Sequence, residues 1–197
     1  GQMVHVGKPV IARNIKGDEA VPSMKLTEIK TGKHLPYKLE KVTITNHTID
    51  KGKYKHYMIK EIFDTPETIR RISKQNPTQY EALAEAIKKA HRIYTIGSGT
   101  AGIAAAQIAF YLRALAQIPA VSLIGADARE FYPLFTKNDL IIAPSQSGET
   151  ADVLEVLEVA QKKGVKIASH VNMPGSMMTR MSDYPFMAEA GAEICVM

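Results

Sequence analysis

After residue 90 the sequence alternates regularly between short apolar runs and segments of helical character. Apolar runs of four or five residues are typical of strands buried on both faces, and the segments between them have the length of single helices. This alternation favours a parallel sheet covered by helices on both sides. It predicts strands at residues 92–96, 120–124, 139–143, 165–169 and 185–188.

Helices are predicted at 101–116, 128–135, 151–163 and 176–181, and Gly164 is a suitable residue to end the third of them. The predicted fold class is therefore α/β: a doubly wound, parallel, five-stranded sheet with flavodoxin-like layering, preceded by a partial β-rich segment.

The first 50 residues have a different character. β-branched or alternating runs at 3–12, 24–29 and 37–44 are separated by Gly, Asp and Pro. So few strands cannot form a good core alone, and we expect them to be the tail of an upstream domain. The predicted organisation is a β-rich tail over 1–50, a linker over 51–57, and a C-terminally incomplete domain over 58–197.

Helical spacing of apolar residues begins just after this linker. Thr65-Pro66 and Asn76-Pro77 each place a capping residue before a proline, which favours a helix start at each proline. Gln79 follows Asn76 at the spacing of a capping box.

Composition and charge exclude several classes of protein. The single cysteine, Cys195, allows neither an internal disulfide nor a cysteine-based zinc site. An uncharged run of 20 residues, 93–112, contains glycines and polar residues that would be costly in hydrocarbon. We therefore expect a soluble, cytoplasmic protein with no membrane partner.

The basic residues are concentrated at one end. Of the formal net charge of +5, residues 1–60 contribute +7, with 12 Lys or Arg against 5 Asp or Glu. Their lysines are scattered singly, without a recognition motif or interleaved aromatic residues. This pattern is typical of a solvated β surface, so we expect no nucleic-acid partner.

The first candidate ligand loop carries a G-x-G-x-x-G pattern in Gly97, Gly99 and Gly102. Such glycines let a backbone approach a ligand, and the following helix supplies free N–H groups. A dinucleotide site would also need an acidic residue at the end of the second strand, and the candidate, Asp127, comes late. An NAD-binding domain is therefore the weakest of the alternatives.

The second candidate loop, 145–150, follows an apolar strand and opens a helix. It carries three hydroxyls and one amide, on Ser145, Gln146, Ser147 and Thr150. Neutral donors at a helix N-terminus suit a phosphate group, and the Lys-Ser/Thr pair of a Walker loop is missing. Simple capping by Ser147 is the alternative, but a cap needs one hydroxyl. We expect a phosphate cradle.

The sequence of the cradle also resembles that of a known protein family. SQSGETADVLEVLEVAQKKG (145–164) closely resembles the signature of sugar isomerase (SIS) domains, and within them of the glutamine–fructose-6-phosphate aminotransferase (glucosamine-6-phosphate synthase) family. Further segments agree in order: KHYMIKEI (55–62), Gly99-Thr100, VNMPGS (171–176) followed by Arg180, Ser182 and Asp183, and AGAEI (190–194). The resemblance covers residues 50–197, and residues 1–49 are similar to the tail of the family's glutaminase domain.

The resemblance implies a sugar-phosphate site without metal or other cofactor. It places the phosphate of fructose 6-phosphate or glucosamine 6-phosphate on Ser145, Gln146, Ser147 and Thr150. It places the sugar near Ser98, Gly99, Thr100 and Val196. Three positions depart from the family pattern: Ser98 replaces a usual Cys, Ala101 a usual Ser, and Cys195 a usual Gly. Ser98 can still donate a hydrogen bond, whereas Ala101 has lost a hydroxyl.

The resemblance also defines what this chain lacks. The family makes ammonia with an N-terminal cysteine, and it isomerises the sugar with a glutamate, a histidine and a Schiff-base lysine carried mostly by a second SIS domain and the C-terminal tail. This chain begins with Gly1. We therefore expect a fragment of the parent aminotransferase that binds sugar phosphate weakly and contributes no catalytic residue.

Two alternatives remain, a non-catalytic sugar-phosphate sensor and, less favoured, the NAD-binding domain. KHYMIKEI favours the synthase, because in that family it joins the glutaminase domain to this one. His56 and His91 flank predicted secondary structure, and we expect them to be surface or packing residues. The carboxylates Glu149 and Glu193 could titrate, but nothing pairs them with a second catalytic group.

The last expectation concerns assembly. Because the sequence stops where a covering helix would follow the last strand, we expect an exposed apolar face and self-association as a homodimer. Helix 101–116 is a candidate contact face through Ala104, Ala105 and Ala106, although packing onto its own sheet is the more usual role of such alanines.

Overall fold

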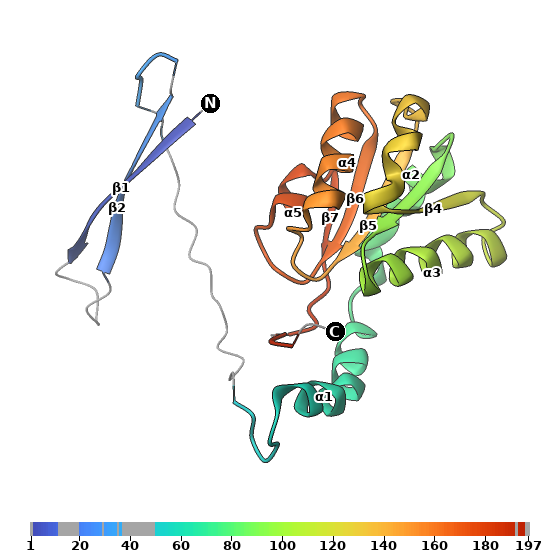
Figure 1. Ribbon diagram of the computed structural model, residues 1–197, viewed down its shortest axis with the longest axis horizontal. Coiled ribbons are helices and arrows are strands. Elements are labelled where there is room, and N and C mark those ends of the chain that lie inside the picture. Colours follow the sequence, from blue (N-terminus) through green and yellow to red (C-terminus); the bar gives the residue numbers. More distant parts are fainter. Residues whose placement is uncertain are drawn as a thin grey trace. The chain divides into compact units, whose positions relative to one another are not determined.

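The computed structural model describes residues 2–11, 20–28, 30–34, 36, 50–191 and 193–195 (Figure 1). The chain divides into two compact units, Gly1–Asn46 and His47–Met197. In the first unit, β1 (Gln2–Ile11) and β2 (Ala20–Glu28) form an antiparallel pair whose register is irregular between Val6 and Pro9. The strand predicted at 37–44 and the site residue Val196 lie outside the described residues.

The second unit contains the predicted parallel sheet. Its strands are β3 (Ile93–Gly97), β4 (Ala120–Ile124), β5 (Leu140–Ser145), β6 (Lys166–Val171) and β7 (Tyr184–Met187). They run parallel in the order β4-β3-β5-β6-β7. Every residue of β3 is buried, as a central strand covered on both faces requires. The predicted α/β fold is confirmed.

Seven helical segments accompany the described strands of this unit. They are α1 (Tyr57–Ile72), η1 (Pro77–Tyr80), α2 (Glu81–Lys89), α3 (Thr100–Ala114), η2 (Gly125–Leu134), α4 (Ala151–Lys162) and α5 (Met177–Met181). No helix among the described residues is long and apolar enough to cross a membrane.

The helices cover the sheet from both sides and create two core clusters. On one face, α4 packs Val156 and Leu157 against Ile141 and other strand residues, together with η2 and α5. On the other face, α2 and α3 contribute Leu83 and Ala109. This arrangement is the doubly wound layering that the alternation of apolar runs predicts.

The predicted helix start at Pro66 is wrong, because Pro66 lies inside the continuous helix α1. The Thr65 hydroxyl donates to the Glu61 carbonyl (3.1 Å), but the carbonyl that loses its partner to Pro66 is that of Ile62. Pro66 itself is exposed, and a missing backbone N–H is tolerated better where the turn faces solvent.

The predicted start at Pro77 is confirmed, but the capping box is wrong. The Asn76 side chain accepts a hydrogen bond from the Thr78 N–H (3.0 Å). Gln79 does not return to Asn76; its side chain lies 3.5 Å from that of Gln75. The segment is a single short 3₁₀ turn, which lacks the geometry of the first turn of an α-helix.

Candidate functional site

The order of the strands places both predicted ligand loops at one edge of the sheet. From β3 the chain moves outward to β4 and then returns to β5 on the other side of β3. The loops that follow β3 and β5 therefore leave adjacent strands at a switch point, where open α/β sheets bind ligands. The sheet brings residues 98–100 and 145–150 to the same edge.

The glycines after β3 serve packing and turning. A Cβ on Gly97 would lie 2.5 Å from the Ala101 carbonyl carbon and 2.7 Å from the Gly102 nitrogen, so α3 begins directly against the end of β3. Gly99 adopts φ 58° and ψ −133° at the N-cap of α3, a conformation that only glycine adopts readily. The G-x-G-x-x-G pattern thus has a structural explanation without a dinucleotide.

Ser98 and Thr100 differ in accessibility. Thr100 is exposed in the first turn of α3. The Ser98 hydroxyl is buried without a hydrogen-bond partner among the described residues. It faces Gly125, where an added Cβ would lie 2.8 Å from the Ser98 Oγ. In this conformation Thr100 and the Gly99 backbone are the groups of this loop that solvent can reach.

The cradle, residues 145–150, forms a tight loop between β5 and α4. The Ser145 Oγ accepts a hydrogen bond from the Gly148 N–H (2.9 Å), and the Ser147 Oγ accepts one from the Glu149 N–H (3.2 Å). Neither hydroxyl donates to another group among the described residues, so each hydroxyl hydrogen is available to a ligand. The loop therefore offers donors to an acceptor-only ligand.

Capping by Ser147 is not what the structure shows. The N-cap residue of α4 is Thr150, and the Thr150 side chain makes no cap hydrogen bond. The hydroxyls of Ser147 and Thr150 are therefore not consumed in starting the helix. The N-terminus of α4 adds free backbone N–H groups and the positive end of its dipole.

The loop that follows β6 packs against the cradle and forms hydrogen bonds with its backbone. The Gln146 carbonyl accepts from the N–H groups of Asn172 (3.2 Å) and Met173 (3.1 Å), which follow β6. Gly148 has φ 68°, and an added Cβ would lie 2.7 Å from the Ser176 Cβ and 2.9 Å from the Val171 Cγ1. Glycine is therefore required at this position both by conformation and by space.

Glu149 belongs to this support. Its carboxylate accepts a hydrogen bond from the Met177 N–H (2.8 Å) at the start of α5.

Glu193 lies beyond β7, where burial, and then the charge of Glu61, raise the pKa of its carboxyl above the usual range. The His91 side chain is mostly exposed, 4.0 Å from the Asp139 carboxylate. Among the described residues, no hydrogen bond joins Glu149, Glu193 or His91 to a second titratable side chain, as acid–base catalysis would require.

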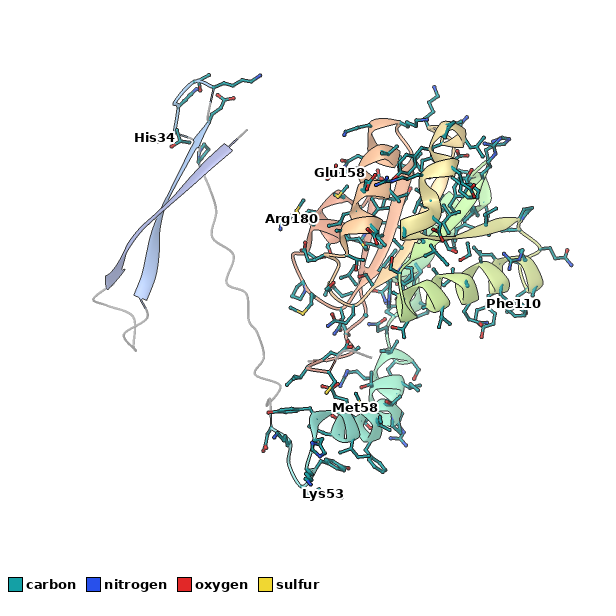
Figure 2. All side chains as sticks on the ribbon, viewed as in Figure 1. His34, Lys53, Met58, Phe110, Glu158 and Arg180 are labelled. Atoms are coloured by element: carbon teal, nitrogen blue, oxygen red, sulfur yellow. The ribbon has the colours of Figure 1, made fainter. Side chains whose placement is uncertain are left out.

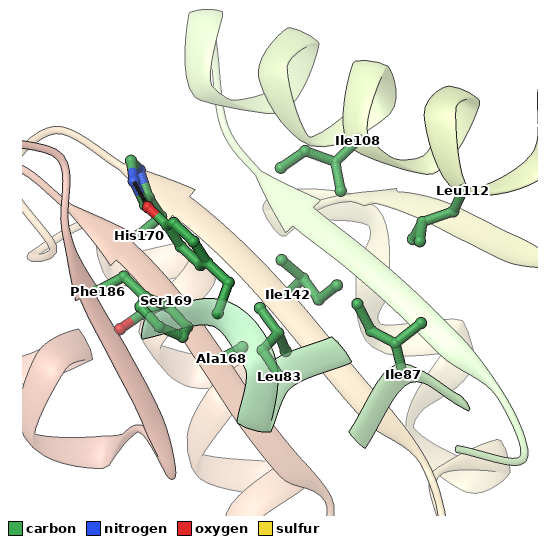
Figure 3. Close-up of a pocket in the computed structure, with 10 residues that line it drawn as sticks. Leu83, Ile87, Ile108, Leu112, Ile142, Ala168, Ser169, His170 and Phe186 are labelled. Atoms are coloured by element: carbon green, nitrogen blue, oxygen red, sulfur yellow. Dashed lines mark hydrogen bonds between the residues drawn. The ribbon is translucent and has the colours of Figure 1, made fainter. Parts of the chain in front are cut away.

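An apolar cavity of about 350 Å³ lies on the sheet face between α2 and α3 (Figure 3). Its polar residues are Tyr80, Ser169 and His170; the apolar ones are Leu83, Ile87, Ile108, Leu112, Ile142, Ala168 and Phe186. The Tyr80 hydroxyl lies 3.4 Å from the His170 Nε2, and burial lowers the pKa of His170. The lining of the cavity includes no residue of the cradle.

Sequence reasoning missed Asn172 and Glu61 as individual residues, although both lie in segments that carry the family resemblance. The Asn172 side chain and the Glu61 carboxylate both bind main-chain atoms of the segment after β7. The only available signals were an amide directly after an apolar strand and an acid within an amphipathic helix.

The sequence profile of the family described as "SIS domain" matches residues 86–197. The chain is 34% identical over 160 residues to the glutamine–fructose-6-phosphate aminotransferase of Pyrobaculum aerophilum, an alignment that covers 81% of this chain and 26% of that protein. The chain therefore spans about a quarter of the length of the curated relatives it matches.

Two solved structures illustrate the likeness of the fold. The C-terminal domain of glucosamine-fructose-6-phosphate aminotransferase from Francisella tularensis has a TM-score of 0.63 and 31% identity, covering 74% of this chain and 42% of that one. The Vibrio vulnificus NanR protein complexed with ManNAc-6P has a TM-score of 0.58 and 20% identity, covering 66% of this chain and 51% of that one. At 20% identity, the similarity to NanR concerns the fold alone.

Proposed function

We propose, from the premise that this chain belongs to the SIS domain family, that it binds fructose 6-phosphate or glucosamine 6-phosphate as part of a glutamine–fructose-6-phosphate aminotransferase. The observation that carries the proposal is the cradle, whose serine oxygens each accept a backbone N–H and leave their own hydrogens to donate. A phosphate dianion accepts hydrogen bonds only, so it matches this donor set.

The proposed site divides the ligand between the two loops. Ser145, Gln146, Ser147 and Thr150 hold the phosphate at the N-terminus of α4. Thr100 and the Gly99 backbone contact the sugar, and the family resemblance adds Val196. Ser98 belongs to the same loop, but its buried hydroxyl faces Gly125 and would have to turn to reach the sugar. The donors of the cradle are neutral, which suits a ligand that must bind and leave repeatedly.

We assign the chain a binding role within the parent enzyme. That enzyme would convert fructose 6-phosphate and glutamine to glucosamine 6-phosphate and glutamate. Glu149 supports α5 through the Met177 N–H, so it is committed to structure. In the same proposal, residues 58–197 are the sugar-phosphate domain, 51–57 the linker, and 1–50 the tail of a glutaminase-like domain.

Calorimetric titration of the chain tests this function. We expect fructose 6-phosphate and glucosamine 6-phosphate to bind with dissociation constants of about 0.1–1 mM, and unphosphorylated fructose and NAD to give no signal. Mixing the chain with glutamine and fructose 6-phosphate should yield no glucosamine 6-phosphate. Tight binding of NAD without a response to either sugar phosphate would contradict the proposal.

The alternative function, a sugar-phosphate sensor, would use the same binding site. It differs in that the domain would belong to a non-catalytic protein and not to an aminotransferase. The relatives at 34% identity are aminotransferases, whereas NanR is similar in fold alone. A sensor would be expected to bind one sugar phosphate tightly, with a dissociation constant of about 1 μM or below. The same titration therefore separates the two functions.

We also propose that the chain forms a homodimer through α3. Phe110 lies on α3 (Figure 2), and Ile103 lies seven residues before it, on the same side of the helix. Their exposed fractions are 50% and 71%. Ala105 and Ala109, on the opposite side, are buried against the sheet. The central alanine of 104–106 thus packs inward, and the larger apolar side chains form the candidate contact face.

Sedimentation equilibrium at tens of micromolar should show a dimer for the natural sequence and a monomer for Phe110→Asp. A charge at a packed apolar contact is costly unless it is paired, so one substitution should suffice. Leu134→Asp is the matched control, since Leu134 is similarly exposed at the end of η2 and should leave the dimer intact. A folded monomer for the natural sequence would contradict the proposal.

A further inference from the structure

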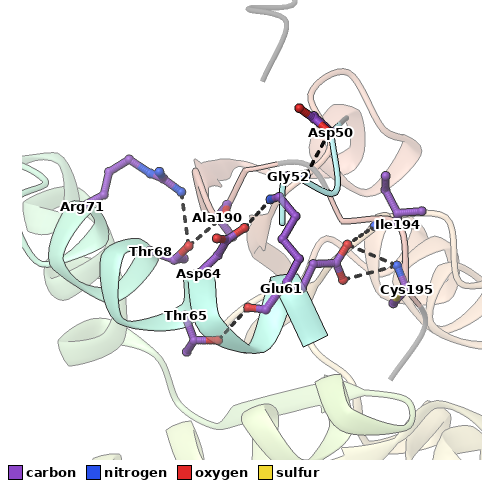
Figure 4. Close-up of polar contacts among 11 residues, drawn as sticks. Asp50, Gly52, Glu61, Asp64, Thr65, Thr68, Arg71, Ala190, Ile194 and Cys195 are labelled. Carbon is purple, nitrogen blue, oxygen red and sulfur yellow. Dashed lines mark hydrogen bonds and ion pairs between the residues drawn. The ribbon is translucent and has the colours of Figure 1, made fainter. Parts of the chain in front are cut away.

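The segment that follows β7 is held mainly through its backbone. This post-β7 segment, residues 188–191 and 193–195, leaves the same edge of the parallel sheet as the cradle does. Side chains from α1 bind it on one side (Figure 4), and the Asn172 side chain binds it as well. It contains two residues with positive φ, Glu189 (53°) and Gly191 (93°), so its path is a turn and not a continuation of the strand.

Asn172 connects this segment to the cradle. Its side-chain amide donates from Nδ2 to the Gly191 carbonyl (2.7 Å), and its Oδ1 accepts from the Ala190 N–H (2.8 Å). Its backbone N–H points to the carbonyls of Ser145 (3.3 Å) and Gln146 (3.2 Å). One half-buried residue thus bonds both to the backbone of the cradle and to the post-β7 segment.

Helix α1 binds the same segment from the other side. The Arg71 Nε donates to the Glu189 carbonyl (2.9 Å), and the Thr68 hydroxyl donates to the Ala190 carbonyl (3.4 Å). The Glu61 carboxylate accepts from the Ile194 N–H (2.8 Å) and from the Cys195 N–H (3.3 Å). These side chains lie seven and three residues apart, on one face of the helix.

We propose that Asn172 is a positioning residue that fixes the post-β7 segment against the cradle and so sets the sugar end of the site. This inference rests on the proposed binding of a hexose 6-phosphate. In this proposal the cradle makes the phosphate contacts, and the post-β7 segment, which leaves the same edge of the sheet, faces the sugar part that a bare phosphate lacks. Asn172 therefore governs affinity for the sugar part of the ligand.

The chemistry of the Asn172 amide gives a nearly isosteric test. Aspartate at 172 keeps an oxygen that accepts from the Ala190 N–H but places its second oxygen against the Gly191 carbonyl. Two acceptors at the 2.7 Å separation of the present hydrogen bond repel each other, so the segment should move away. The cradle loop itself loses no side-chain hydrogen bond.

The experiment compares two ligands by calorimetry on the full chain. For Asn172→Asp we expect affinity for fructose 6-phosphate to fall about tenfold, and affinity for inorganic phosphate to change less than about twofold. Asn76→Asp is the matched control, because Asn76 uses only its acceptor oxygen, towards the Thr78 N–H, and should change neither affinity. The inference would be overturned if both affinities stayed the same or if both fell by the same factor.

A second variant and a measurement without ligand test the inference independently of the Asn172→Asp titration. Glu61→Ala removes the bonds from α1 to the Ile194 and Cys195 N–H groups and should produce the same selective loss. Hydrogen exchange of the Ile194 amide, which is bonded to Glu61, should become about tenfold faster in Asn172→Asp, and an unchanged rate there would refute the coupling. If the natural chain binds no hexose phosphate but this exchange rate rises, the proposed function fails while the positioning of the segment stands.

Discussion

Replacing Gly97 by alanine is expected to lower the free energy of unfolding by about 3 kcal/mol or more. The added Cβ would lie 2.5 Å from the Ala101 carbonyl carbon and 2.7 Å from the Gly102 nitrogen. These atoms belong to the backbone of the first turn of α3, so no side-chain rotation can relieve the overlap. The helix would have to move away from β3, which is buried throughout.

Gly102→Ala is the matched control at the same junction. Its Cβ would lie 3.3 Å from the Gly97 carbonyl oxygen, a close contact that a small shift relieves. Alanine also favours a helix over glycine by about 1 kcal/mol, which offsets the shift. Urea unfolding of both variants should therefore show a large loss for Gly97→Ala and a change within about 1 kcal/mol for Gly102→Ala. Equal losses would show that the close approach of helix and strand is not the cause.

The second large effect concerns ligand binding. The double variant Ser145→Ala, Ser147→Ala should lower affinity for fructose 6-phosphate by about 100-fold, because each hydroxyl is expected to donate one hydrogen bond to a charged phosphate oxygen. The Gly148 N–H and Glu149 N–H also lose their acceptors. A stability loss of about 1–2 kcal/mol should accompany the loss of affinity.

The control must remove a comparable serine hydroxyl away from the cradle. The Ser182 hydroxyl donates to the Met178 carbonyl (2.7 Å) at the end of α5, so Ser182→Ala should cost similar stability per residue and leave the affinity unchanged. Calorimetry and thermal unfolding of the two variants separate the effects. If the double variant is folded and binds fructose 6-phosphate like the natural chain, the cradle is not the phosphate site.

The strands were predictable because each is a short apolar run between helical segments, even at β4, where three of the five residues are exposed. The run 120–124 matches β4 residue for residue, and the other predicted strands overlap β3, β5, β6 and β7. Helix starts were harder to predict. A proline is compatible both with the first position of a helix and with an exposed turn in its interior. The sequence does not distinguish these two positions, whereas the structure shows that α1 continues through Pro66.

The composition of the cradle was sufficient to suggest it as a candidate, because its functional groups lie within six consecutive residues. The support of the site could not be predicted in the same way. Glu61 and Cys195 are separated by 134 positions, and the Glu61 carboxylate binds main-chain N–H groups that every residue except proline carries. Such contacts do not depend on the side chain of the partner residue, so a single sequence contains no signal for them.

The binding of the post-β7 segment through its main chain determines which changes it can accommodate. Glu61, Thr68 and Arg71 contact peptide groups, so exchanging most side chains in the segment would leave these bonds in place. Removing or inserting one residue would instead shift every peptide group out of register with α1 at once. Natural variation in this part of the fold should therefore appear as substitutions at constant loop length, and designed sequences should keep that length fixed.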